Sequence, residues 1–288
     1  MAIKKCIYTL NINGYAPEIT ALTFPLMTHF AEKIRADFHV ISERKFPDWP
    51  ITYEKLQIFE LAREHKNDWN WFFDADALIS PEQFDVTEHL KKDTVCHNGR
   101  DMAGIRWKYD EYFRRDGRHF GSCNWCTIAS DWCLDLWRPL DDITLEQALS
   151  NINITIGEHN SGFCQTEHLI DDYTLSRNIA RFGLKATTLT DIGGQLGWRM
   201  PDGRGSSPFL WHKYTISNQQ KVEEMLAVLT TPNGDPAFAE KGELIRDAFG
   251  NLRMKMPDGR IVNQAGMGLG LMTEAEAAAY KEQWAKKA

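Results

Sequence analysis

The sequence lacks any apolar run long enough to cross a membrane, and it has few cysteines for its length. A membrane-spanning helix needs about 20 apolar residues, whereas one of the longest uncharged stretches, Ile19–Met27, is short and contains Pro25. The first residues, MAIKKCIYTLNIN, show neither the apolar segment nor the cleavage site of a secretory signal. Six cysteines in 288 residues do not form a disulfide framework. We therefore expect a cytoplasmic protein with reduced thiols.

An excess of positive charge is also absent. The chain has 33 lysines and arginines against 40 aspartates and glutamates, which gives a net charge of −7. This balance argues against indiscriminate binding to nucleic acid or to anionic membranes. Hydrophobic residues, in contrast, make up 43% of the chain, as in ordinary globular proteins. The ten tryptophans are core residues or platforms for flat ligands and sugar faces.

Strand and helix patterns alternate through the first half of the chain. Strands are expected at Lys5–Asn11, Phe38–Ile41 and Trp69–Phe73, and helices at Glu18–Arg35 and Tyr53–Glu64. A further helix is expected from Pro81, because Ser80 can cap it and Gln83 completes a capping box. Alternating strands and helices indicate βαβ units and a mostly parallel sheet flanked by helices, an α/β fold.

The second half has a less regular pattern. It predicts strands at Asn124–Ala129 and Phe209–Trp211 and a helix at Glu167–Phe182 that ends at Gly183. Beyond residue 220 the pattern becomes helical, at Lys221–Leu229, Phe238–Phe249 and Thr273–Lys287. We therefore predict a catalytic domain over residues 1–220 and a mainly helical C-terminal extension over residues 221–288.

Two carboxylates, Asp74 and Asp76, follow the apolar run Trp69–Phe73 directly. Ligand sites of open parallel sheets lie at the carboxyl ends of the strands. If the chain stays extended, both carboxylates point to the same side and the small Ala75 points away. Paired hard oxygens suit Mg²⁺ or Mn²⁺ bridging to a diphosphate. The alternative is an Asx-type turn leading into the next helix.

The segment Trp69–Leu78 resembles the aspartate-x-aspartate (DXD) element of the GT-A nucleotide-sugar glycosyltransferases, and the glycogenin-like, family 8 retaining enzymes are the most similar. Four other segments are similar to elements of that family, in the same order along the chain. They are Tyr8–Tyr15 (first strand and nucleoside loop), Tyr53–Gln57 (the lysine near the donor), Ile170–Leu175 (the element beside the transferred sugar) and Leu210–Lys213 (the late histidine).

The resemblance implies a GT-A (Rossmann-like) fold and the transfer of a sugar from a nucleotide sugar, preferably UDP-linked, with retention of configuration. It implies a Mn²⁺ or Mg²⁺ site made of Asp74, Asp76 and His212. The other implied roles are nucleoside binding for Thr9, Asn11 and Tyr15, donor binding for Lys55, Asp74 and Lys213, a position near the reacting carbon for Asp172, and binding of donor hydroxyls for Asp171.

The chain departs from the family pattern at three places. The spacer between Lys55 and Asp74 is longer than usual. Asp172 stands where the family has glutamine, so the group facing the reacting carbon is charged. Asn218 stands where the family has a lysine, for which Lys213 or Lys221 can substitute. These departures leave the family and the stereochemistry open, and inversion would require a carboxylate acting as general base toward the acceptor.

The segment Arg100–Phe120 mixes basic and aromatic residues, which can hold phosphates and stack on bases or sugars. By resemblance it forms the acceptor wall, with Arg106, Trp107 and Asn124 as acceptor-binding residues. The acceptor is a saccharide, a protein side chain or a hydroxylated nucleobase, although the net charge disfavours nucleic acid. The alternative for the segment is a solvated helix with a partly buried aromatic stripe.

Other interpretations stay open from the sequence. His212 can be a core histidine, Lys55 a solvated helix residue, and Asp171 an N-cap. The pair Cys123 and Cys126 has the spacing of zinc ligands but lacks a second pair. At the level of function, the alternatives are a nucleotidyltransferase, a glycosyltransferase acting on a hydroxylated DNA base, and a non-catalytic carbohydrate-binding protein.

Overall fold

A computed structural model of the whole chain provides the structure. It describes residues 3–81, 83–98, 125–154, 156–162, 165–195, 209–213, 216–231, 243–246, 252–255, 261–262 and 268–286. The predicted acceptor residues Arg106, Trp107 and Asn124 lie outside the described residues, as does Cys123. The described cysteines, Cys6, Cys96, Cys126 and Cys133, are buried free thiols.

A six-stranded sheet with the order β2-β1-β3-β6-β5-β7 forms the centre of the molecule. Its strands are β1 (Lys5–Leu10), β2 (Ala36–Ile41), β3 (Trp69–Phe73), β5 (Thr94–His97), β6 (Cys126–Ser130) and β7 (Lys185–Thr188). Strand β6 runs antiparallel to both of its neighbours, and the other pairs are parallel. The fold is therefore α/β with a mostly parallel sheet, as the alternating sequence pattern predicts.

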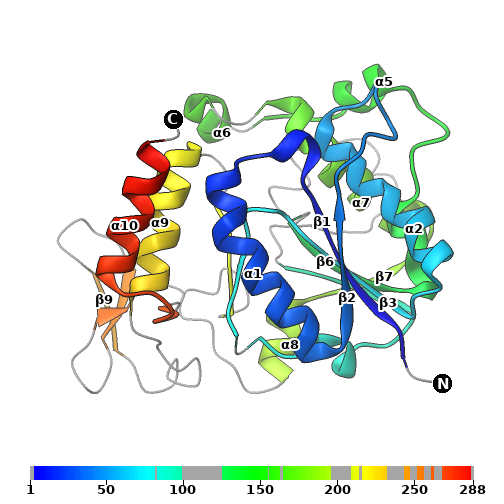
Figure 1. Cartoon of the computed structure of the whole chain (residues 1–288). Helices are drawn as coiled ribbons and strands as arrows, with labels where there is room; N and C mark the ends of the chain where they lie inside the picture. The colour runs from blue at the N-terminus through cyan, green and yellow to red at the C-terminus, as the bar shows by residue number, and fades with distance from the viewer. Residues whose placement is uncertain are drawn as a thin grey trace.

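Helices cover both faces of this sheet (Figure 1). The α-helices are α1 (Pro17–Ile34), α2 (Ile58–His65), α5 (Leu145–Ser150), α6 (Ile156–Ser161), α7 (Ile170–Arg181), α8 (Leu189–Gln195), α9 (Asn218–Thr230) and α10 (Glu274–Ala285). The 3-10 helices are η1 (Ile12–Gly14), η2 (Ile51–Gln57), η3 (Val86–His89), η4 (Asp131–Trp137) and η5 (Thr166–Leu169). The expected helix over Tyr53–Glu64 is thus a 3-10 turn that continues into α2.

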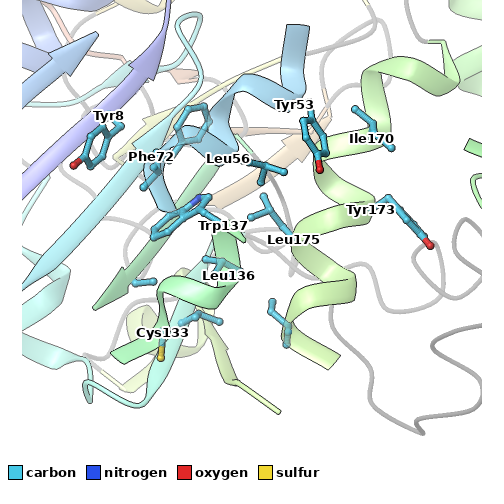
Figure 2. Close-up of a cluster of buried hydrophobic side chains, with 14 of the residues drawn as sticks. Tyr8, Tyr53, Leu56, Phe72, Cys133, Leu136, Trp137, Ile170, Tyr173 and Leu175 are labelled. Carbon is cyan, nitrogen blue, oxygen red and sulfur yellow. The ribbon is translucent and has the colours of Figure 1, made fainter. Parts of the chain in front are cut away.

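Strand β3 contributes side chains to two hydrophobic cores, one on each face of the sheet, because its side chains alternate between the two faces. Trp71 and Phe73 pack with α1 on one face, and Phe72 packs with α2, η4 and α7 on the other. Figure 2 shows the second core, where Trp137 lies among Phe72, Leu136 and other apolar side chains. A strand buried on both faces explains the nearly continuous apolar run in the sequence.

A small two-stranded sheet follows β3 in place of an immediate helix. Strand β4 (Leu78–Ile79) pairs antiparallel with β8 (Leu210–Trp211), and the backbone N–H of Ser80 donates to the carbonyl of Phe209 at 2.8 Å. The helix expected from Pro81 is therefore wrong: Ser80 extends the strand pairing, and the next helical turn is η3, capped by Asp85.

The C-terminal region contains strands as well as helices. Helices α9 and α10 lie side by side next to α1 (Figure 1), and a third core of α1, α9 and α10 side chains holds them together. The strands β9 (Glu243–Arg246), β10 (Leu252–Lys255) and β11 (Ile261–Val262) form an antiparallel sheet. The helix expected over Phe238–Phe249 is wrong, because β9 lies within it. The division into domains at residue 220 stays a prediction.

Within the described part of the chain, none of the helices combines the length and the apolar character that a membrane crossing requires.

Asp142, in the loop between η4 and α5, contacts helix α7, and this contact predicts that stability depends on pH. Arg177 donates two hydrogen bonds to Asp142, at 2.9 and 2.7 Å, which holds the pKa of Asp142 below its usual 3.8. The ionised carboxylate therefore stabilises the folded state at pH values above its pKa in the unfolded chain. This stabilisation is lost as the pH falls through its lower pKa in the folded protein. Because Asp142 is 37% exposed, Asp142→Asn should lower the free energy of unfolding at pH 7 by only about 1 kcal/mol. In urea titrations this difference should shrink below pH 3.8; a difference that persists unchanged at pH 2.5 would contradict the assignment.

Candidate metal centre

The turn between β3 and β4 carries Asp74 and Asp76. The amide of Asp74 donates to the carbonyl of Trp125 at 2.9 Å, and the amide of Ala77 closes a turn on the carbonyl of Asp74 at 3.0 Å. The hydroxyl of Thr23 in α1 donates to the carbonyl of Ala75 at 2.5 Å. The chain therefore turns at Ala75 and does not stay extended, and its own Ala77–Asp74 hydrogen bond, Trp125 and α1 fix that turn.

His212 reaches the same place because β8 pairs with β4. The register sets Leu78 opposite Trp211, so the residue after β8 lies beside the turn that precedes β4. His212 Nε2 lies 3.2 Å from Asp76 Oδ1 and 3.6 Å from Asp74 Oδ2. The imidazole stacks on the Trp125 ring, with 4.9 Å between the ring centroids. Ring stacking and strand pairing thus hold the histidine against both carboxylates.

These three side chains have the geometry of a divalent cation site. Their ligand atoms lie within 4.8 Å of one another. A magnesium-sized ion binds octahedral ligands at about 2.1 Å, so adjacent ligand atoms lie about 3 Å apart. The distances of 3.2 and 3.6 Å between His212 and the two carboxylates are close to that value. Two carboxylates and one imidazole also suit Mn²⁺. The residues present therefore fit a Mg²⁺ or Mn²⁺ ion.

A buried lysine lies on one side of this cluster. Lys55, at the end of η2, forms an ion pair with Asp171 in the first turn of α7, and both side chains are 1% exposed. Its ammonium group also lies 3.4 Å from Asp74 Oδ1 and 4.3 Å above the ring of Phe72. The structure therefore places Lys55 inside the site, and the interpretation as a solvated helix residue is wrong.

A second lysine lies on the opposite side. Lys221, in the first turn of α9, forms an ion pair with Asp76 Oδ2, and its side chain is 10% exposed. Tyr15 donates to Asn218 Oδ1 at 3.4 Å, which joins the loop after β1 to α9. Acidic and basic groups consequently alternate through the site in the order Asp171, Lys55, Asp74, His212, Asp76, Lys221.

The surroundings of the two carboxylates separate their acidities. Burial raises the pKa of Asp74, and interactions with Lys55 and His212 offset only part of that effect. Burial also raises the pKa of Asp76, but His212 and Lys221 outweigh it and hold that pKa well below its usual range. Burial lowers the pKa of Lys55 and of Lys221, but their carboxylate partners more than compensate, so the pKa of each lysine is raised. Both lysines therefore carry a charge at neutral pH.

Other predicted site residues lie nearby or are directed elsewhere. Asp172 follows Asp171 on α7, and its amide donates to Asp171 Oδ1 at 2.8 Å. Thr9 is fully buried on β1, and Asn11 stands at the end of that strand. Lys213 instead forms an ion pair with Glu224 at 2.7 Å. Of the two lysines that can substitute for the family's late lysine, Lys221 and not Lys213 contacts the acidic pair.

Sequence reasoning missed Trp125, whose ring and carbonyl position His212 and Asp74. The only sequence signal for Trp125 was its position beside the predicted acceptor residue Asn124, at the start of the segment that contains β6. Sequence reasoning also missed the ion pair between Asp171 and Lys55, while the predicted binding of donor hydroxyls by Asp171 stays a prediction. Both contacts join elements far apart in the chain, so local sequence patterns carry no trace of them.

Comparisons with known proteins complete the description of the site. The sequence matches no protein-family model and no curated protein. Among solved structures, the chain is similar to a "glycosyltransferase involved in the glycosylation of the major capsid of PBCV-1", with 10% sequence identity and a TM-score of 0.43. The match covers 77% of this chain and 98% of that chain. Because this overlap is loose, the case for a function comes from the side chains of the site.

Proposed function

We propose that the protein is a metal-dependent glycosyltransferase that moves a sugar from a nucleotide-diphosphate sugar, preferably a UDP-sugar, to an acceptor hydroxyl. The observation that carries this proposal is the cluster of Asp74, Asp76 and His212 at the carboxyl end of β3, with a buried lysine on each side. Sites at the carboxyl ends of parallel strands are where α/β folds bind nucleotides.

The residue types fit the charge changes of glycosyl transfer. Breaking the bond between sugar and phosphate leaves a nucleoside diphosphate with increased negative charge. A divalent cation, when bound, would act as a Lewis acid and neutralise part of that charge. Lys55 and Lys221 add positive charge that is already in position before the reaction, so little reorganisation is needed. His212 and the two carboxylates would hold the cation.

The loop after β1 is placed to hold the nucleoside. Tyr15 is 39% exposed and borders the acidic pair, because partial burial and the nearby charge of Asp76 raise its pKa while Lys221 opposes this. The side-chain amide oxygen Oδ1 of Asn11 is buried without a hydrogen-bond partner among the described residues. A buried polar atom usually has a partner, so a ligand hydroxyl at this edge of the sheet would satisfy Asn11. Thr9 is fully buried and is less accessible to a ligand.

Asp172 remains our candidate for the group that faces the reacting carbon. It lies in the first turn of α7, next to the Asp171–Lys55 pair, and is 8% exposed. A carboxylate there would stabilise the oxocarbenium-like state of the sugar. Retention of configuration and a place near the glycogenin-like family 8 enzymes follow from the sequence resemblance alone. The acceptor roles of Arg106, Trp107 and Asn124 likewise stay predictions.

A thermal-shift screen tests the proposed function. We expect a UDP-sugar together with Mn²⁺ to raise the melting temperature more than either ligand alone, because a ligand at 100 times its Kd adds about 2.7 kcal/mol of stability. Release of free sugar and UDP from the stabilising donor would then identify the transferred group. If nucleoside triphosphates stabilise more strongly and a labelled nucleotide is incorporated, the protein is a nucleotidyltransferase and the proposal is wrong.

A further inference from the structure

Lys221 forms an ion pair with Asp76, a carboxylate that is also a candidate ligand of the metal ion. Asp76 has two carboxylate oxygens, and the structure divides them: Oδ1 faces His212 at 3.2 Å, and Oδ2 is taken by the ammonium group of Lys221. Both partners of this ion pair are about nine-tenths buried. An incoming cation would therefore share a carboxylate with a fixed positive charge.

The backbone of Lys221 is firmly held, so only its side chain can respond to a ligand. Helix α9 begins with a capping box between Ser217 and Gln220, and the amide of Lys221 donates to the carbonyl of Ser217 at 2.9 Å. Three turns of the helix bury Met225, Leu226 and Leu229 against α1 and α10. A lysine side chain has four rotatable bonds, so the ammonium group can leave Asp76 while the helix stays in place.

The net charge of the site favours movement of the Lys221 ammonium group away from Asp76 only when an anion is present. Three carboxylates (Asp74, Asp76 and Asp171) face two lysines (Lys55 and Lys221). A divalent cation added to this set, with a neutral His212 as ligand, leaves an excess of positive charge in a buried place. A diphosphate restores the balance, because its negative charge gives both the cation and the Lys221 ammonium group a new partner.

We propose that Lys221 is an internal counter-ion that keeps the metal affinity of the nucleotide-free protein low and makes metal binding depend on a nucleoside diphosphate. In the free protein, the ammonium group competes with the metal for Asp76. When the diphosphate binds, it attracts the ammonium group and releases Asp76 to the metal. By linkage, the metal must raise the affinity for the diphosphate by the same factor. This inference rests on the proposed function, since it takes a diphosphate as the ligand.

The test compares the Mn²⁺ affinity of the full-length wild type with that of Lys221→Met, measured by the EPR signal of free Mn²⁺. Without nucleotide, the variant should bind Mn²⁺ about tenfold more tightly, a size typical of coupling between sites. With saturating UDP, the wild type should gain more Mn²⁺ affinity than the variant gains. Equal or weaker Mn²⁺ binding by the nucleotide-free variant would overturn the inference.

Lys5→Met is the matched control, because the Lys5–Asp85 ion pair is as buried as Lys221–Asp76 but lies at the other end of β1. Its Mn²⁺ affinity should equal that of the wild type. Lys221→Gln, which keeps a hydrogen-bond donor without the charge, should also bind Mn²⁺ more tightly, and this covers the case in which the methionine variant does not fold.

Assays of donor turnover separate the two proposals. Mn²⁺-dependent release of UDP by the wild type, combined with no gain of Mn²⁺ affinity in either variant, overturns the counter-ion role alone. If none of the proteins binds Mn²⁺, with or without UDP, both proposals are wrong.

Discussion

Replacing Asp76 with asparagine should reduce metal-dependent turnover of a nucleotide sugar by about 10²–10³-fold, the usual cost of removing one electrostatic contact to a transition state. Asp76 is the shared partner of His212 and Lys221. The amide of asparagine keeps the shape but removes the negative charge that holds the cation. The release of UDP from a UDP-sugar, followed over a range of Mn²⁺ concentrations, measures the loss.

The control for this variant is Asp85→Asn. Asp85 is also a largely buried aspartate in an ion pair with a lysine, but it caps η3 and its partner Lys5 lies at the start of β1, away from the cluster at the carboxyl ends of the strands. Its turnover should equal that of the wild type, and circular dichroism should show both variants folded. Unchanged turnover in Asp76→Asn would refute the assignment of the metal site.

The second large effect concerns stability. Lys55→Met should lower the free energy of unfolding by about 3–5 kcal/mol, the typical cost of removing one partner from a buried ion pair. Lys55 and Asp171 are both 1% exposed, so loss of the lysine removes a cationic partner from a carboxylate that is buried beside Asp74. Urea unfolding at pH 7, monitored by tryptophan fluorescence, measures the change.

An exposed pair and a double variant make this prediction specific. Lys185 pairs with Asp93 at the surface, with side chains 70% and 41% exposed, so Lys185→Met should cost less than 1 kcal/mol, roughly the upper bound for exposed pairs. Lys55→Met combined with Asp171→Leu should recover much of the stability, because the buried carboxylate that loses its lysine partner is removed as well. A cost for Lys55→Met no larger than that for Lys185→Met would show that the buried pair contributes little.

Four of the six strands of the central sheet (β1, β2, β3 and β6) were predictable because each has a local pattern, whereas β5 and β7 were not predicted. Trp69–Phe73 is almost entirely apolar, and the structure has β3 with the same bounds. The last helix is predicted from Thr273, and the structure has a capping box there, with both hydrogen bonds between Thr273 and Glu276 present. Local signals of this kind act within a few residues, so one sequence is enough to recognise them.

The errors occurred where distant contacts decide the structure. Ser80 has the chemistry of a helix cap, but its backbone pairs with Phe209, more than a hundred residues away. The region Phe238–Phe249 has helical periodicity, yet β9 forms there by pairing with β10. In both places strand pairing overrides the local preference, and a strand partner is not visible in a local pattern.

The candidate site was predictable only in part for the same reason. Asp74 and Asp76 can be recognised in the sequence because they directly follow an apolar strand. His212 could be added only through a family resemblance, because the β4–β8 pairing that brings it to Asp76 leaves no local signal. The choice between Lys213 and Lys221 required the structure, in which Lys221 alone of the two contacts an acidic residue of the cluster.

The most direct measurement is anomalous X-ray diffraction from crystals of this protein soaked with Mn²⁺ and UDP. We predict a manganese peak bounded by Asp74, Asp76 and His212, with the two phosphates of UDP on the open side of the ion and Lys55 and Lys221 on either side. An empty acidic pair, with UDP bound elsewhere or not bound at all, would contradict the account.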